Sequence, residues 1–237
     1  MTTTQPLTPI NPVPAGSTLA ATPTQAPDTA ATLPPTLPVT QKRALPSGLG
    51  RRNKQLAVLV RDRSGSMSGP KLAELNQACI AFQREVADPI NEDGILISVI
   101  DFNHGAELRC SAQIASMMTM PEAICSGGTN FDAPLKAALA EVEGFMTGPN
   151  PEGWTLLRPQ VLFLSDGHAG VTDRNIQALH EVATVTAVAY GADADRATLE
   201  RISSDGQVHV IGTSGDQLRQ FFAEVGKTMT SAFNAAP

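Results

Sequence analysis

The segment DRSGS places oxygen-bearing side chains at every second position. Asp62, Ser64 and Ser66 alternate with Arg63 and with Gly65, which permits a tight backbone. In an extended turn, this spacing lets the three side-chain oxygens converge. Hard oxygen donors of this kind are the ligands that Mg²⁺ and Mn²⁺ prefer in proteins. The segment is therefore a candidate for part of a divalent-metal site.

A second aspartate occupies an equivalent place further along the chain. Asp166 follows the apolar run PQVLFLS, just as Asp62 follows the apolar run QLAVLV, and both runs are typical of buried parallel strands. In the doubly wound strand order 3-2-1-4-5-6, strands 1 and 4 are neighbours, and ligands bind in the crevice at their carboxyl ends. Two carboxylates would repel each other there, with the pKa of one raised. A divalent cation between them would remove the conflict.

The elements that must position these residues alternate along the chain. The apolar patterns predict six strands, at 55–60, 94–102, 106–114, 159–165, 184–192 and 207–212. The turn NHG predicts a hairpin between the second and third of them. Helical patterns occupy 70–88, 134–146, 172–183, 195–203 and 216–233. We therefore predict an α/β fold with a doubly wound, mainly parallel six-stranded sheet and helices on both faces.

Composition divides the chain near residue 53. Residues 1–53 are mostly Thr, Pro, Ala and Leu, and the first aromatic residue of the chain is Phe82. Such a segment cannot bury enough apolar surface to offset its ordering entropy. We predict that residues 1–53 form a disordered tail and that residues 54–237 form one domain. The tail would act as a tether, and its threonines beside proline could accept phosphate.

Net charge divides at the same place. Residues 1–54 carry one acidic and five basic side chains, which is +4, so the rest of this protein of net charge −6 carries −10. An acidic domain without a basic stripe is a poor candidate for nucleic-acid binding. The start MTTTQPLTPINPV lacks the features of a secretory signal, and no run approaches the roughly eighteen apolar residues of a membrane span. We therefore expect a cytoplasmic protein that binds neither nucleic acid nor membrane.

The cysteines do not indicate a metal site. Cys79, Cys110 and Cys125 are odd in number and lack the C-x-x-C spacing of a zinc site. We predict free, mostly buried thiols.

Three motifs together resemble a known family. DRSGSM after the first strand, SGGTNFDAPL before a helix and FLSDG after the fourth strand resemble the metal-ion-dependent adhesion site of the von Willebrand factor A (vWA) domain, over residues 54–233. The resemblance implies that Mg²⁺ (or Mn²⁺) is bound by five residues, with the hydroxyls contacting the ion directly. These residues are Asp62, Ser64, Ser66, Thr129 and Asp166. It also implies one coordination position that is left for water or for a partner's Glu or Asp.

The segment SGSMSGPKLAELNQA resembles compact bacterial intracellular members of this family. These include proteins of tellurite-resistance and stress clusters, which are found with kinases and phosphatases. The resemblance implies a protein–protein interaction module without catalysis, which binds an acidic residue of a protein partner in a bacterial stress-response or signalling assembly. A kinase or phosphatase acting with it is the kind of partner that this subgroup suggests.

Two enzyme classes are alternatives to this interpretation. A magnesium-dependent phosphatase of haloacid dehalogenase type also uses an aspartate after the first strand, but it generally needs a second acid two residues later, where this chain has Ser64. A serine hydrolase needs serine at the centre of its nucleophile elbow, and the centre of GSMSG is Met67. A further alternative is an interaction domain that has lost its metal, which the complete set of five positions disfavours.

The charged neighbours of Asp62 are predicted to lie away from it. Adjacent side chains on a strand point to opposite faces, so Arg61 and Arg63 should not neutralise Asp62. Asp101 ends the second predicted strand at the level of Arg61. We predict an ion pair between Arg61 and Asp101, with Arg63 exposed at the rim and available to an acidic partner.

Two polar residues near the motif have simpler explanations than metal chemistry. Pro134 is hard to place deep inside a helix, so the helix should start near Asp132, with Asp132 as its N-cap. A position behind the metal ligands is the alternative for Asp132. His168 is predicted to be a surface loop residue.

Overall fold

The computed structural model describes residues 53–212 and 214–236. The tail predicted for residues 1–53 lies outside these residues except for Asn53, which begins the first strand. The described part forms a sheet whose main path has the order β3-β2-β1-β5-β6-β7, and a short strand, β4, pairs with β1 beside this path. Except for that short addition, the path has the predicted six strands in the predicted doubly wound order.

The strands of the main path are parallel except at one edge. The hairpin partners β2 and β3 are antiparallel, as the NHG turn predicted, and the other pairs are parallel. The strands are β1 (Asn53–Asp62), β2 (Ile95–Phe102), β3 (Ala106–Ile114), β4 (Thr155–Leu156), β5 (Gln160–Ser165), β6 (Thr184–Tyr190) and β7 (Val208–Ile211).

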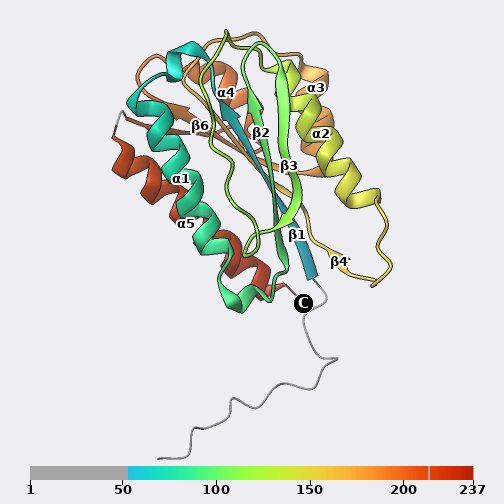
Figure 1. The fold of residues 1–237 in the computed structure, drawn as a ribbon. Helices are drawn as coiled ribbons and strands as arrows, with labels where there is room; N and C mark the ends of the chain where they lie inside the picture. The colour runs from blue at the N-terminus through green and yellow to red at the C-terminus, as the bar shows by residue number, and fades with distance from the viewer. Residues whose placement is uncertain (1–52, 213, 237) are drawn as a thin grey trace, which may run out of the picture. The chain divides into compact units, whose positions relative to one another are not determined.

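Helices cover both faces of the sheet (Figure 1). The helices α1 and α5 pack side by side on one face, and α2, α3 and α4 cover the other. Their bounds are α1 (Pro70–Val86), α2 (Asp132–Thr147), α3 (Asp173–Val182), α4 (Arg196–Ile202) and α5 (Gly215–Ala235). None of the described helices has the length and apolar character needed to cross a membrane.

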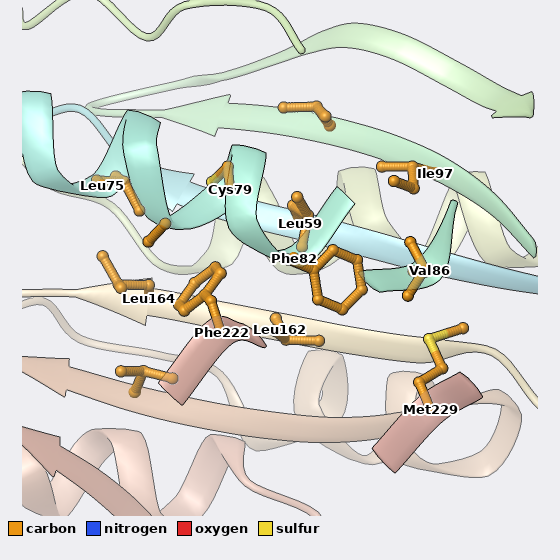
Figure 2. Packing of buried hydrophobic residues seen from close by; sticks show 14 of the residues in the cluster. Leu59, Leu75, Cys79, Phe82, Val86, Ile97, Leu162, Leu164, Phe222 and Met229 are labelled. Carbon is orange, nitrogen blue, oxygen red and sulfur yellow. The ribbon is translucent and has the colours of Figure 1, made fainter. Parts of the chain in front are cut away.

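Alternation along β1 divides the core into two layers. Leu59 faces α1 and α5, whereas the next residue, Val60, faces the layer under α2, α3 and α4. Figure 2 shows Leu59 near Phe82 of α1 and Phe222 of α5, all of them nearly inaccessible to solvent. Burial of such a side chain contributes about 1.5–3 kcal/mol. Burial on both faces explains why β1 reads as a continuous apolar run.

The strand register fixes where the two candidate carboxylates lie. Arg61 of β1 pairs with Leu164 of β5, so Asp62 and Asp166 both lie at the carboxyl ends of neighbouring parallel strands. The sheet winds in opposite directions on either side of this pair of strands, which is where doubly wound folds bind their ligands. The strand order therefore brings two residues that are far apart in sequence to one edge.

Candidate metal centre

The loop after β1 brings its three predicted oxygen side chains together. The N–H of Ser64 donates a hydrogen bond to Asp62 Oδ1 at 2.8 Å, and the hydroxyls of Ser64 and Ser66 lie 3.0 Å apart. The chain then enters the short 3-10 helix η1 (Gly65–Met67), in which Met67 is fully buried. Met67 thus anchors the loop in the core, and the hydroxyls stay at the edge of the sheet.

Asp166 joins this cluster from the loop after β5. The Ser66 hydroxyl donates to Asp166 Oδ1 at 2.7 Å. Asp62 Oδ2 accepts a hydrogen bond from Ser165 Oγ, which in turn accepts one from the N–H of Gly167 at 3.0 Å. The two carboxylates therefore share a continuous hydrogen-bonded network.

The pKa of Asp62 is raised because its carboxylate is buried. Asp62 is 0% exposed. Burial raises its pKa; hydrogen bonds from Ser165 and Ser64 oppose this rise, and the charge of Asp166 adds to it. A cation at this place would favour the ionised form of both aspartates.

Thr129 reaches the cluster from the loop before α2. A Cβ built on Gly167 would lie 2.9 Å from Thr129 Oγ1 and 3.5 Å from Asp62 Oδ2. The threonine hydroxyl and the Asp62 carboxylate thus both approach the backbone of residue 167, where only glycine leaves room. All five predicted residues therefore come from three loops to one place.

Arg61 helps to hold the loop that carries Thr129. Its Nε donates to Asp101 Oδ1 at 2.7 Å, and its Nη1 donates to the carbonyl of Pro121 at 2.9 Å. This confirms the predicted ion pair with Asp101. Burial favours the neutral form of Arg61, but neighbouring Cys79 and Asp101 outweigh it and raise the pKa of the guanidinium. The arginine stays charged and connects β1 to β2 and to the loop.

The prediction for Arg63 was wrong. Its side chain is 19% exposed rather than free at the rim. Its Nη1 donates to Ser126 Oγ at 2.9 Å, and its Nη2 lies 3.3 Å from Glu107 Oε2. The N–H of Ser126 also donates to the Arg63 carbonyl at 2.8 Å. The loop before α2 folds against Arg63 and covers it, which strand alternation alone does not predict.

Further bonds join the first and second loops. The N–H of Gly65 donates to the Gly127 carbonyl at 2.9 Å, and Cys125 Sγ donates to the Ser64 carbonyl at 2.8 Å. Gly127 has a φ of 73°, and a Cβ there would lie 2.7 Å from His104 Nδ1. The positive φ therefore favours glycine at this turn, two residues before Thr129. The three cysteines are free, with Cys79 buried and the other two partly so.

Asp132 is not the N-cap that the sequence predicted. Asp132 is the first residue of α2. The N–H of Ala133 instead donates a hydrogen bond to Asn130 Oδ1 at 3.1 Å. The Asp132 carboxylate accepts hydrogen bonds from the N–H and hydroxyl of Thr172 and from Asn175 Nδ2. Its role is to join α2 to the start of α3. The helix does begin at Asp132, as predicted. The first turn of α2 is bonded by Asn130 rather than by Thr129.

His168 lies on the surface, as predicted. Its side chain is 70% exposed, and its Nδ1 is 3.8 Å from Asp195 Oδ2. His168 comes two residues after Asp166 in sequence, but the acidic residue that it contacts is Asp195, on the loop before α4.

Sequence reasoning missed two residues that contact the carboxylates. Ser165 bonds Asp62, and Lys71 Nζ lies 2.5 Å from Asp166 Oδ2. Ser165 ends an apolar strand directly beside Asp62, a position that the strand order does predict to be close. Lys71 is the second residue of α1. Its contact with Asp166 depends on the direction in which α1 starts after the first loop, and a periodic sequence pattern does not predict this direction.

The chemistry of the five residues fits a hard divalent cation. They offer two carboxylates and three hydroxyls, which are oxygen donors only. Among residues 53–212 and 214–236, no three His, Cys, Asp or Glu side chains gather into a metal-binding group. The candidate site therefore depends on its serine and threonine hydroxyls as much as on its aspartates.

Comparisons with known proteins identify the fold. No family model matches the sequence, and no curated protein matches it. Among solved structures, a von Willebrand factor type A protein from Catenulispora acidiphila is 21% identical with a TM-score of 0.60, and the match covers 75% of this chain and 43% of that one. The vWF domain of the type V pili tip protein Mfa5 from Porphyromonas gingivalis is 12% identical with a TM-score of 0.59, over 78% of this chain and 98% of that one.

A third structure has the same fold with metal present. Proximal thread matrix protein 1 from the mussel byssus, solved with a zinc-occupied MIDAS motif, is 18% identical with a TM-score of 0.53, over 75% of this chain and 46% of that one. This chain spans less than half the length of the Catenulispora and mussel proteins. Strand order and helical layers define a doubly wound α/β domain. Its fold is that of the vWA domain, as the sequence resemblance predicted.

Proposed function

We propose that this protein is a metal-ion-dependent interaction module, which binds an acidic residue of a protein partner through Mg²⁺ or Mn²⁺. The observation that carries the proposal is the convergence of Asp62, Ser64, Ser66, Thr129 and Asp166 from three loops. These loops lie at the carboxyl edge of the sheet, where doubly wound folds bind ligands.

Each group would have a defined part in such a site. Asp62 and Asp166 supply the negative charge, and the hydroxyls of Ser64, Ser66 and Thr129 supply neutral oxygen donors. With the carboxylates buried, the bound ion would act as a Lewis acid toward an incoming carboxylate. The loop contacts of Arg61 and Arg63 would hold Thr129 in place for this purpose.

The structural neighbours support this class of function. One of them is described with a zinc-occupied MIDAS motif and another as part of a pili tip protein. We propose Mg²⁺ or Mn²⁺ here because the donors are all oxygen. A bacterial stress-response or signalling assembly with a kinase or phosphatase, in the cytoplasm, stays a prediction from the sequence resemblance.

The phosphatase alternative is disfavoured by the surroundings of Asp62. A phosphatase of this type generally needs a second acid two residues after its nucleophile, and Ser64 occupies that position here. Asp62 Oδ1 accepts from the N–H of Ser64, and Asp62 Oδ2 accepts from Ser165. We therefore propose no catalytic step for this site.

The proposal can be tested by thermal unfolding and partner capture. An ion that binds only the folded state stabilises it by about 1.4 kcal/mol at ten times Kd. We expect Mg²⁺ or Mn²⁺ to raise Tm, and we expect Asp62→Ala and Thr129→Ala to abolish this shift. A partner captured by the wild-type protein should be lost with EDTA and with Asp62→Ala, and its own Glu→Gln or Asp→Asn change should weaken binding.

Two results would contradict the proposal. EDTA that leaves both Tm and partner capture unchanged would exclude a functional metal. Hydrolysis of a generic phosphomonoester that depends on Mg²⁺ and on Asp62 would favour the phosphatase instead.

A further inference from the structure

A lysine occupies the side of Asp166 that faces α1. Lys71 Nζ lies 2.5 Å from Asp166 Oδ2, while the other oxygen of that carboxylate accepts from Ser66. The Asp166 side chain is 1% exposed and the Lys71 side chain is 25% exposed. The pair is thus largely shielded from water, which strengthens it relative to a surface ion pair.

The position of Lys71 is fixed by the start of its helix. Pro70 begins α1, and Lys71 follows it directly, so the helix directs this side chain across the first loop. A Cβ on Gly191, which follows β6, would lie 3.5 Å from Lys71 Nζ. The ammonium group therefore lies between the loop after β6 and Asp166.

We propose that Lys71 is a tethered cation that a divalent ion must displace from Asp166. This inference rests on the metal site of the proposed function. The ammonium neutralises the Asp166 carboxylate when no metal is bound, and its positive charge repels an approaching cation. Lys71 would therefore lower the metal affinity of the site. Its charge would also reduce the repulsion between Asp62 and Asp166 when no metal is bound.

The displaced ammonium has a second acidic partner within reach. Glu74 lies three residues after Lys71 and thus on the same face of α1. The Glu74 carboxylate accepts a hydrogen bond from Tyr190, the last residue of β6. Metal binding would then let the Lys71 side chain turn along its own helix toward Glu74.

Calorimetric titration with Mn²⁺ tests this directly. Lys71→Met keeps the length of the apolar stem and removes the charge, so we expect it to bind Mn²⁺ about tenfold more tightly than the wild-type protein. Lys227→Met is the matched control, because Lys227 on α5 pairs with Glu224 and is 54% exposed. The control should bind Mn²⁺ with wild-type affinity.

The outcomes separate this inference from the proposed function. Equal Mn²⁺ affinity in wild-type and Lys71→Met protein would show that Lys71 is not a competitor, while the metal site would stand. Binding of Mn²⁺ by neither protein would exclude the metal site itself.

Lysine labelling of the wild-type protein gives a test that needs no variant. Acetylation followed by mass spectrometry should modify Lys71 faster with Mn²⁺ than with EDTA, because the ammonium has left Asp166. Lys227 should react at the same rate in both conditions. An unchanged Lys71 rate under conditions in which calorimetry shows Mn²⁺ bound would overturn the exchange.

Discussion

Arg61 and Asp101 form an ion pair on adjacent strands that is closed to solvent. The Nε–Oδ1 distance is 2.7 Å, and the two side chains are 1% and 0% exposed. The second oxygen, Asp101 Oδ2, is 4.0 Å from Arg109 Nη1, which is beyond hydrogen-bond distance. Arg61 is therefore the main partner of Asp101, and Asp62 next to it remains available to a different cation.

Removing Arg61 should strongly destabilise the domain. Arg61→Met leaves the Asp101 charge buried without its partner, so we expect a loss of about 3–5 kcal/mol in the free energy of unfolding. Asp101→Asn added to Arg61→Met should then cost little more, because the pair is already broken. Denaturant unfolding of the two single variants and the double variant measures this.

Arg63→Met serves as the comparison. Arg63 pairs with the half-exposed Glu107 at 3.3 Å, so its loss should cost about 1 kcal/mol. Equal effects of the two arginine substitutions, or full additivity of Arg61→Met with Asp101→Asn, would contradict the buried pair.

A side chain at residue 167 should disturb the candidate metal centre. The Cβ of Gly167→Ala would lie 2.9 Å from Thr129 Oγ1, so Thr129 or the loop must move. We expect Mn²⁺ affinity to fall by about tenfold or more, since overpacking of this kind costs about 1–3 kcal/mol. Gly170→Ala, where a Cβ has nothing within 4 Å, should bind Mn²⁺ as the wild-type protein does. A similar loss in both variants would indicate a general effect of alanine in this loop.

The contribution of Asp132 to stability should depend on pH. Partial burial acts to raise its pKa, but hydrogen bonds from Thr172 and Asn175 outweigh this effect and hold the pKa below the usual value of an aspartate. A lowered pKa means that the stabilisation is present above the unfolded-state pKa and is lost as the pH falls through the folded-state value. Asp132→Asn should therefore cost about 1 kcal/mol at neutral pH.

Denaturant unfolding at two pH values checks this expectation. The difference between wild-type and Asp132→Asn protein should shrink as the pH falls through the folded-state pKa of Asp132, which lies below the usual value of an aspartate. A difference of the same size at both pH values would show that the ionised carboxylate is not what stabilises this contact.

Deleting residues 1–50 should leave the domain nearly unchanged. We predict that this segment is a tether, so its removal should alter neither Tm nor the Mn²⁺-induced shift in Tm by a measurable amount. Thermal unfolding of the shortened chain with and without Mn²⁺ provides the measurement. A large fall in either quantity would show that the segment packs on the domain.

The fold was predictable because its strands and helices carry clear sequence patterns, which are apolar runs for the strands and helical periodicity for the helices. β1 and β5 read as unbroken apolar runs since both of their faces are buried. The hairpin of β2 and β3 was predicted from its short turn. The two-residue strand β4 was missed because Thr155 and Leu156 are too short a segment to carry any period.

The contacts between loops were harder to predict. Sequence reasoning placed Asp101 beside Arg61 because strand register is regular, but it left Arg63 exposed because the path of the loop before α2 follows no register. The same limit hid Lys71, whose contact with Asp166 joins a helix start to a loop. Asp132 was misassigned because Asn130, two residues earlier, bonds the N–H of Ala133 instead.

Diffraction from crystals grown with Mn²⁺ tests the central claim most directly. The anomalous signal of manganese locates the ion without reference to any assumed ligand. We predict a peak among Asp62, Ser64, Ser66, Thr129 and Asp166, with the three hydroxyls in direct contact with the ion and Lys71 Nζ withdrawn from Asp166. No peak at this position, at Mn²⁺ concentrations that saturate the protein in solution, would contradict the assignment of these five residues as a metal site.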